Sequence, residues 1–302
     1  ILSSENTPYS ELDQLLTPFA RDEILLDSLI EKSKKAGNLI GEVYGYNQLG
    51  KLSANRFLYQ KALEYYSNAL EIAKEKGQSG LMLSTLNLLG STSTRIDSIK
   101  NALYYHQEVI RMVNTEDSPN EDSQREEGKA YHGLGKIYQA LGRYDQAVRY
   151  FDAAIGKFKD INYTEGLAFS LNAKGESLEA LGKLSESLSL YQESTRLNDL
   201  LGSDRLMVLN TLGIAHVLAH EEGRAREAQE LITSKLLERT DTMDPELLAL
   251  LYTQYGWVLN NLKQYVLAEE YLTKGLELAR QLNMTSYIFD GNIWLHDGWE
   301  AR

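Results

Sequence analysis

The sequence predicts an all-α fold: a right-handed superhelical solenoid of antiparallel helix pairs, with about six repeats and partial caps. Three observations predict it. Only 4 Pro occur in 302 residues, which leaves room for long uninterrupted helices. Glycines, each of which weakens a helix by about 1 kcal/mol relative to Ala, recur with a period close to 40 residues. Small and aromatic residues recur at fixed offsets from these glycines.

The periodic glycines define six copies of one unit. They are Gly50, Gly90, Gly135, Gly175, Gly213 and Gly256. Twelve residues after each comes a small residue, in order Ala62, Ala102, Ala147, Ser187, Ala225 and Ala268. Sixteen residues after the first four come Tyr66, His106, Phe151 and Tyr191. A Gly on a first helix and an Ala on a second let two antiparallel helices approach closely, with Leu and aromatic residues filling the sides.

This period sets the expected boundaries along the chain. Residues 1–38 are expected to form an N-terminal capping helix or helix pair, 39–282 the six repeats, and 284–302 a partial seventh repeat or C-terminal cap. The repeats are expected at approximately 39–78, 79–123, 124–163, 164–203, 204–243 and 244–283. The polar, acidic segment 114–123 accounts for the one long interval and is expected to be a solvated loop.

The third copy shows the residue pattern most fully. It carries Leu134, Gly135, Tyr138, Ala147, Phe151 and Ala154. With this pattern the chain resembles the tetratricopeptide repeat family over roughly residues 39–282. The period exceeds the usual length of about 34 residues and resembles the long-repeat variant of kinesin light chains, the Rap and PlcR peptide receptors, and the sensor segments of bacterial regulators such as MalT. The resemblance implies a groove, lined by the first helices, that binds a peptide or protein.

One position of that groove is rich in asparagine. Three residues before each repeat glycine the sequence reads Asn47, Asn87, His132, Asn172, Asn210 and Thr253. An amide is both donor and acceptor, which suits binding the backbone of an extended peptide, and the resemblance implies this use of Asn in the long-repeat relatives. The alternative is that these amides bond a neighbouring repeat or water.

A second set of residues is expected to line the groove, and their charge changes along the chain. Lys51, Lys136 and Trp257 directly follow repeat glycines, and Asn55 and Arg95 lie one helical turn beyond that position in the first two copies. The groove is therefore expected to be basic early and apolar late. We expect a partner with an acidic or carboxylate end near Lys51, Arg95 and Lys136, and an apolar side chain near Trp257; the alternative is that these are scattered, solvated charges.

Composition disfavours several function classes. The net charge of −12 argues against binding to nucleic acid or anionic lipid, both of which require clustered Lys and Arg. With 0 Cys there is no disulfide and no thiol catalysis. No apolar run is long enough for a membrane span. Residue 1 is Ile, so we expect that the N-terminus has been trimmed. The expected compartment is the cytoplasm or the periplasm. The oligomeric state is left open.

The remaining candidates for chemistry are two histidines. His216 and His220 have the one-turn spacing that a zinc pair requires, but the sequence shows no converging third ligand. We therefore predict no catalytic residue, no metal, no cofactor and no enzymatic activity. The predicted function is a peptide- or protein-binding scaffold or sensor segment of a bacterial signalling or transcription-regulatory protein. The alternatives are a structural assembly adaptor without a peptide groove and a helical metal-dependent enzyme.

Overall fold

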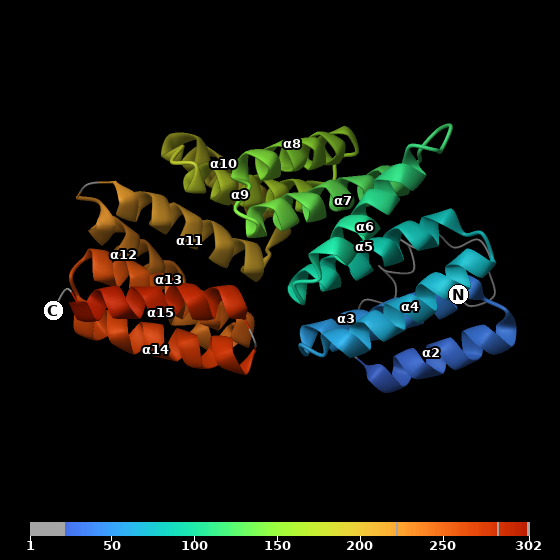
Figure 1. The fold of residues 1–302 in the computed structure, drawn as a ribbon, viewed down its shortest axis with the longest axis horizontal. Coiled ribbons are helices and arrows are strands. Elements are labelled where there is room, and N and C mark those ends of the chain that lie inside the picture. Colours follow the sequence, from blue (N-terminus) through green and yellow to red (C-terminus); the bar gives the residue numbers. More distant parts are fainter. Residues whose placement is uncertain (1–21, 222, 283, 301–302) are drawn as a thin grey trace. The chain divides into compact units, whose positions relative to one another are not determined.

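The computed structural model describes residues 22–221, 223–282 and 284–300, which contain helices and no β-strand (Figure 1). The predicted all-α fold of antiparallel helix pairs is thereby confirmed. The first described helix, α2 (Glu23–Ala36), is capped by the Asp22 side chain and ends at Gly37, which adopts a left-handed conformation at φ 66°. The part of the N-terminal expectation that concerns residues 1–21 lies outside the described residues.

Among the residues that the structure describes, six helix pairs and one further helix follow α2. They are α3 (Leu39–Asn55) with α4 (Tyr59–Glu75), α5 (Ser79–Arg95) with α6 (Ile99–Val113), α7 (Glu121–Ala140) with α8 (Tyr144–Asp160), α9 (Thr164–Ala180) with α10 (Leu184–Leu201), α11 (Asp204–His220) with α12 (Ala225–Lys235), α13 (Pro245–Asn261) with α14 (Tyr265–Gln281), and α15 (Thr285–Glu300). The acidic loop is shorter than expected because Asn120 caps α7, its side chain accepting from the Ser123 amide at 2.8 Å. The fifth pair is irregular: α12 is short and continues into the 3-10 helix η2 (Leu237–Thr242).

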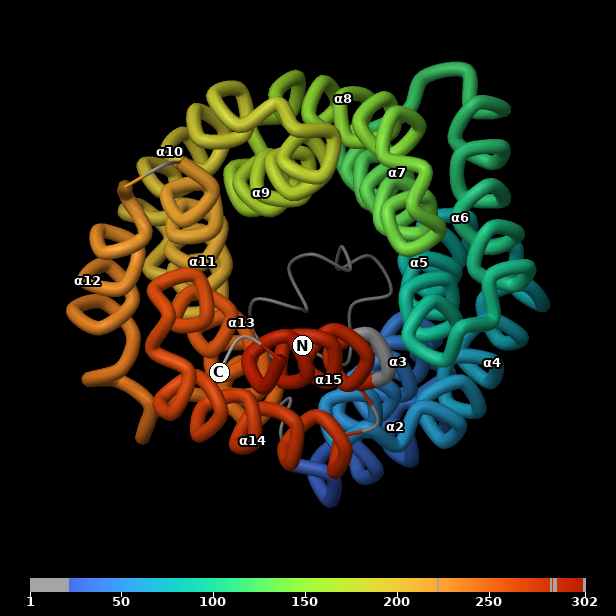
Figure 2. The backbone as a smooth tube through the Cα atoms, turned by 60° about the vertical axis from the view of Figure 1, so that its left-hand side comes forward, coloured from blue at the N-terminus to red at the C-terminus, as the bar shows by residue number. Residues whose placement is uncertain are grey.

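The helices group into two compact units, which we describe separately. Unit 1 comprises residues 1–166 and unit 2 comprises residues 167–302. Within unit 1, α5 contacts both α3 and α7; within unit 2, α13 contacts both α11 and α15 (Figure 2). Within each unit, these first helices of successive pairs are thus neighbours, and their side chains can meet across repeats.

The repeat glycines are sites of close helix approach, as their spacing predicts. A Cβ on Gly135 would lie 2.5 Å from the Phe151 ring, and one on Gly90 would lie 2.7 Å from the His106 ring. In both cases the ring belongs to the second helix of the same pair and is fully buried. A side chain at either glycine would therefore displace a packed ring.

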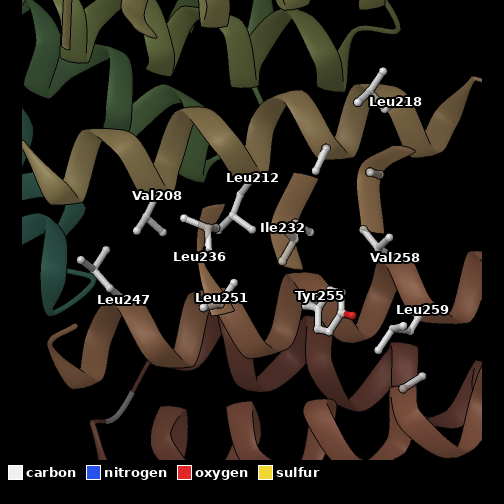
Figure 3. Packing of buried hydrophobic residues seen from close by; sticks show 13 residues of the cluster. Val208, Leu212, Leu218, Ile232, Leu236, Leu247, Leu251, Tyr255, Val258 and Leu259 are labelled. Atoms are coloured by element: carbon white, nitrogen blue, oxygen red, sulfur yellow. The ribbon is translucent and has the colours of Figure 1, made fainter. Parts of the chain in front are cut away.

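An apolar core cluster in unit 2 joins α11, α12 and α13. Leu212 of α11, Ile232 of α12 and Leu251 of α13 lie in one buried cluster with neighbouring Leu, Val and Tyr side chains (Figure 3). Burial of this kind stabilises a fold by about 25 cal/mol for each Å² of apolar surface. This core holds α11 against α13 and so sets the relative positions of their partly exposed side chains.

In the part of the chain that the structure describes, no helix combines the length and the apolar character that a membrane span requires.

Candidate functional site

The recurring asparagines do not line an open groove. Their exposed fractions are 0% for Asn47, 6% for Asn87, 2% for Asn172 and 1% for Asn210. The Asn47 amide donates to Thr85 Oγ1 at 3.0 Å, and the Asn172 amide donates to Asn210 Oδ1 at 2.8 Å. The expectation that these four amides face a ligand is wrong, because close packing of neighbouring first helices encloses them. Each of them bonds a neighbouring repeat, which is the alternative that the sequence left open.

Asn87 and two partners form a buried network in unit 1. The Asn87 amide nitrogen donates to the backbone oxygen of Glu126 at 2.9 Å and to its carboxylate at 2.8 Å. Its oxygen must therefore accept the proton of His106 Nδ1, which lies 3.0 Å away. Burial lowers the pKa of His106 to about 4, so the imidazole is neutral. This network is structural.

The other predicted groove residues of unit 1 have mixed surroundings. His132 is partly buried against Phe151, with a ring separation of 5.4 Å, and burial lowers its pKa to about 3. Asn55 is exposed, whereas Lys51 and Lys136 are partly buried. The Arg95 guanidinium lies over the Tyr59 ring at 6.0 Å. A partner with a carboxylate end remains a prediction.

Chemistry-bearing side chains converge in unit 2, where Trp257 lies. His216 and His220 are one turn apart near the end of α11, Glu179 is near the end of α9, and Trp257 is on α13. His216 Nδ1 lies 2.8 Å from Glu179 Oε1. The Trp257 ring stacks on His216 at 4.1 Å and lies 5.1 Å from the His220 ring. We call these four residues the His–Trp cluster.

Surrounding groups orient the cluster. The Tyr191 hydroxyl donates to Glu179 Oε2 at 2.9 Å. Burial, together with the Glu179 charge, raises the pKa of Tyr191 well above its usual value, so this hydroxyl keeps its proton. The carboxylate is thus held from both oxygens, by Tyr191 and by His216. His216 Nε2 is buried and has no hydrogen-bond partner among the described residues.

An open depression of about 220 Å³ adjoins the cluster. It is lined by Trp257, Asn260, Asn261, Tyr265, Trp294, Asp297 and Gly298. The Trp257 and Trp294 rings are 6.3 Å apart, and the Asn260 amide donates to the Trp294 backbone oxygen at 2.7 Å. Two indole rings with a polar rim suit an apolar side chain of a ligand.

The sequence pointed to three of the four cluster residues and missed Glu179. Glu179 precedes His216 by 37 residues, slightly less than one repeat. One mean period of 40 residues upstream of His216 lies Glu176, so the period alone does not identify Glu179 as the neighbour. Its proximity to His216 results from the stacking of α9 and α11 and not from any local motif.

Comparison with known proteins identifies the repeat type. The tetratricopeptide repeat pattern matches residues 126–200 and 249–282. No curated protein matches the sequence. A solved Rap protein complexed with competence and sporulation factor is 14% identical, with a TM-score of 0.65, covering 97% of this chain and 84% of that one. The Rap conjugation gene regulator of plasmid pLS20, in complex with the Phr* peptide, is 17% identical, with a TM-score of 0.63, covering 89% and 76%. Aspartyl phosphate phosphatase F from Bacillus subtilis is 11% identical, with a TM-score of 0.60, covering 96% and 79%. At these identities the likeness is one of fold.

Proposed function

Since the chain is a tetratricopeptide-type repeat protein, we propose that it is a scaffold that binds a peptide or protein partner, with the His–Trp cluster and the adjoining depression as part of its binding surface. Of the solved structures that share its fold, one is a complex with the Phr* peptide and another a complex with competence and sporulation factor. We further propose a role within a bacterial signalling or transcription-regulatory protein, acting by binding and without catalysis. This finer role is supported by the resemblance of the repeats.

The observation that carries the proposal is the position of Trp257. Its indole is partly exposed, stacks on His216 and forms a wall of the 220 Å³ depression. A partly exposed tryptophan offers a large apolar area with few rotatable bonds, which makes this residue type frequent among the energetic centres of interfaces. The exposed His220 imidazole lies beside it and supplies a donor and an acceptor for the polar groups of a peptide.

Display selection followed by affinity measurement tests this proposal. A random library of twelve-residue peptides is selected against residues 1–302, and the selected peptides are titrated by calorimetry into the unchanged chain and into two variants. Trp257→Ala should weaken binding about tenfold or more, because truncating a central aromatic residue of an interface typically costs about 2 kcal/mol.

Trp299→Ala is the matched control. Trp299 is 54% exposed on α15 and donates its ring N–H to Glu269 at 3.1 Å. Trp299→Ala removes the same type of side chain from a position that does not line the depression. The affinity for the peptide should therefore be unchanged. Failure to select any peptide, or equal losses in both variants, would contradict the proposed binding surface and favour a structural adaptor.

A further inference from the structure

We propose that Glu179, His216 and His220 form a binding site for a divalent transition metal ion, with Zn²⁺ as the best chemical match. The proposal goes beyond partner binding and does not depend on it. The sequence predicted no metal because it showed only two ligands. The fold brings a third ligand, Glu179, from the neighbouring first helix.

The geometry suits a small metal ion. Each of the three residues offers one ligand atom, and these atoms all lie within 4.8 Å of one another. Two ligands bonded at 2.0–2.1 Å to tetrahedral Zn²⁺ are about 3.3 Å apart. The 2.8 Å between His216 Nδ1 and Glu179 Oε1 is already close to that spacing. His220 is exposed and is the last residue of α11, one helical turn after His216.

The donor types favour Zn²⁺ over the hard cations. Neutral imidazole suits Zn²⁺, Ni²⁺, Cu²⁺ and Co²⁺, whereas Mg²⁺ and Ca²⁺ select sites built from oxygen ligands. Two His and one carboxylate provide three protein ligands, which leaves the fourth tetrahedral position to water or to a donor from a partner.

The surroundings resemble those of a built site. Tyr191 donates to the carboxylate oxygen of Glu179 that His216 does not contact, as outer groups do when they fix the orientation of metal ligands. Trp257 lies against both imidazoles and shields one side of the cluster from water.

An ordinary ion pair explains less of this arrangement. Pairing with Glu179 accounts for the contact of His216 Nδ1 but involves no other imidazole of the cluster. It also gives no reason for His220 to bring a ligand atom to the same point. A metal ion accounts for the convergence of all three side chains.

Zinc and cobalt titration of residues 1–302, with no peptide present, tests the proposal. We expect calorimetry to show one Zn²⁺ per chain, displaced by chelator, and Co²⁺ to give the visible absorption of a tetrahedral site. His220→Ala and Glu179→Gln should each weaken Zn²⁺ binding at least about tenfold, since even loss of an outer-shell partner costs about 10- to 100-fold. Glu179→Gln retains an acceptor for Tyr191, so this variant is expected to fold.

His296→Ala is the matched control, because His296 is 64% exposed on α15 with Asp297 and Glu300 nearby. The affinity of the His296→Ala variant for Zn²⁺ should equal that of the unchanged chain. The proposal is overturned if the unchanged chain binds no Zn²⁺, or if only His296→Ala loses affinity. X-ray absorption at the zinc edge of the unchanged chain gives a second test that needs no variant: two imidazoles at the metal are expected, and fewer than two would overturn the site. Because no peptide is present, a negative result here leaves the partner-binding test independent.

Discussion

Asn87 shows how a side chain that recurs along a repeat protein can serve the fold instead of a ligand. Its amide uses both its donor and its acceptor within unit 1, bonding Glu126 of the next repeat and His106 of its own. The recurrence of Asn at this position reflects the recurrence of helix neighbours. A sequence shows which residue type repeats but not whether the next helix covers it.

Replacing Asn87 by Ala should therefore lower the free energy of unfolding of the chain. The change leaves the buried His106 Nδ1 proton without an acceptor and removes the Asn87 bonds to Glu126, whose carboxylate keeps Lys129 as a partner. A buried polar group left unsatisfied costs about 1–3 kcal/mol. Urea unfolding at pH 7 measures the loss. Asn55→Ala, at an exposed position at the end of α3, should change the unfolding free energy by less than about 0.5 kcal/mol. Unchanged stability in the Asn87 variant would show that the amide is free for another role.

A second prediction concerns His106 and the dependence of stability on pH. Its pKa is about 4 in the folded state because of burial, against an ordinary value of 6.5. Above pH 6.5 both states carry a neutral imidazole, and His106 has no effect on stability. Between pH 6.5 and 4 the unfolded chain takes up a proton that the folded chain does not, so stability falls by about 3 kcal/mol as the pH decreases. Urea unfolding at pH 7 and pH 4.5 should show a smaller loss for His106→Phe than for the unchanged chain. An equal loss in the two proteins would contradict the lowered pKa of His106.

At the scale of the helix pair, the packing rule that the sequence suggested is the one the structure follows. The glycine of a first helix lies against the ring sixteen residues later on the second helix, as in Gly135 with Phe151 and Gly175 with Tyr191. The start of α13 carries a local signal: Asp244 caps the helix by accepting from the Leu247 amide at 2.9 Å, and Pro245 occupies the first turn. The 3-10 turn after α12 was not readable, because it depends on packing in unit 2 and has no local signal.

Substitutions at two glycines of the third helix pair distinguish the effect of packing on stability from the effect of helix propensity. Gly135→Ala adds a Cβ that would lie 2.5 Å from the buried Phe151 ring, and overpacking of this kind costs about 1–3 kcal/mol. Gly156→Ala on α8 adds a Cβ with nothing within 4 Å and should stabilise by about 1 kcal/mol, because Ala is the better helix former. The melting temperatures of the two variants, measured by thermal unfolding, should shift in opposite directions. Stabilisation by both would show that the first helix has room for a side chain at Gly135.

At the scale of the whole molecule, the fold class followed from periodicity, whereas the candidate site followed only in part. The His pair and Trp257 stood out individually in the sequence, but they come together with Glu179 because α9, α11 and α13 are stacked. Glu179 lies 37 residues before His216, and the Asn87 to Glu126 step is 39 residues. The register between repeats varies by a few residues, enough to change which side chains meet, so a mean period of 40 does not identify the contacts.

Hydrogen exchange of residues 1–302, with and without a saturating selected peptide, tests most directly whether the His–Trp cluster binds a partner. At a free peptide concentration of about 100 Kd, amides that exchange only from the unbound state should slow about 100-fold. We expect this protection in unit 2, in the segments that contain Glu179, residues 216–220 and residues 257–261. Protection confined to α3–α8 of unit 1, with these segments unchanged, would contradict the proposed site.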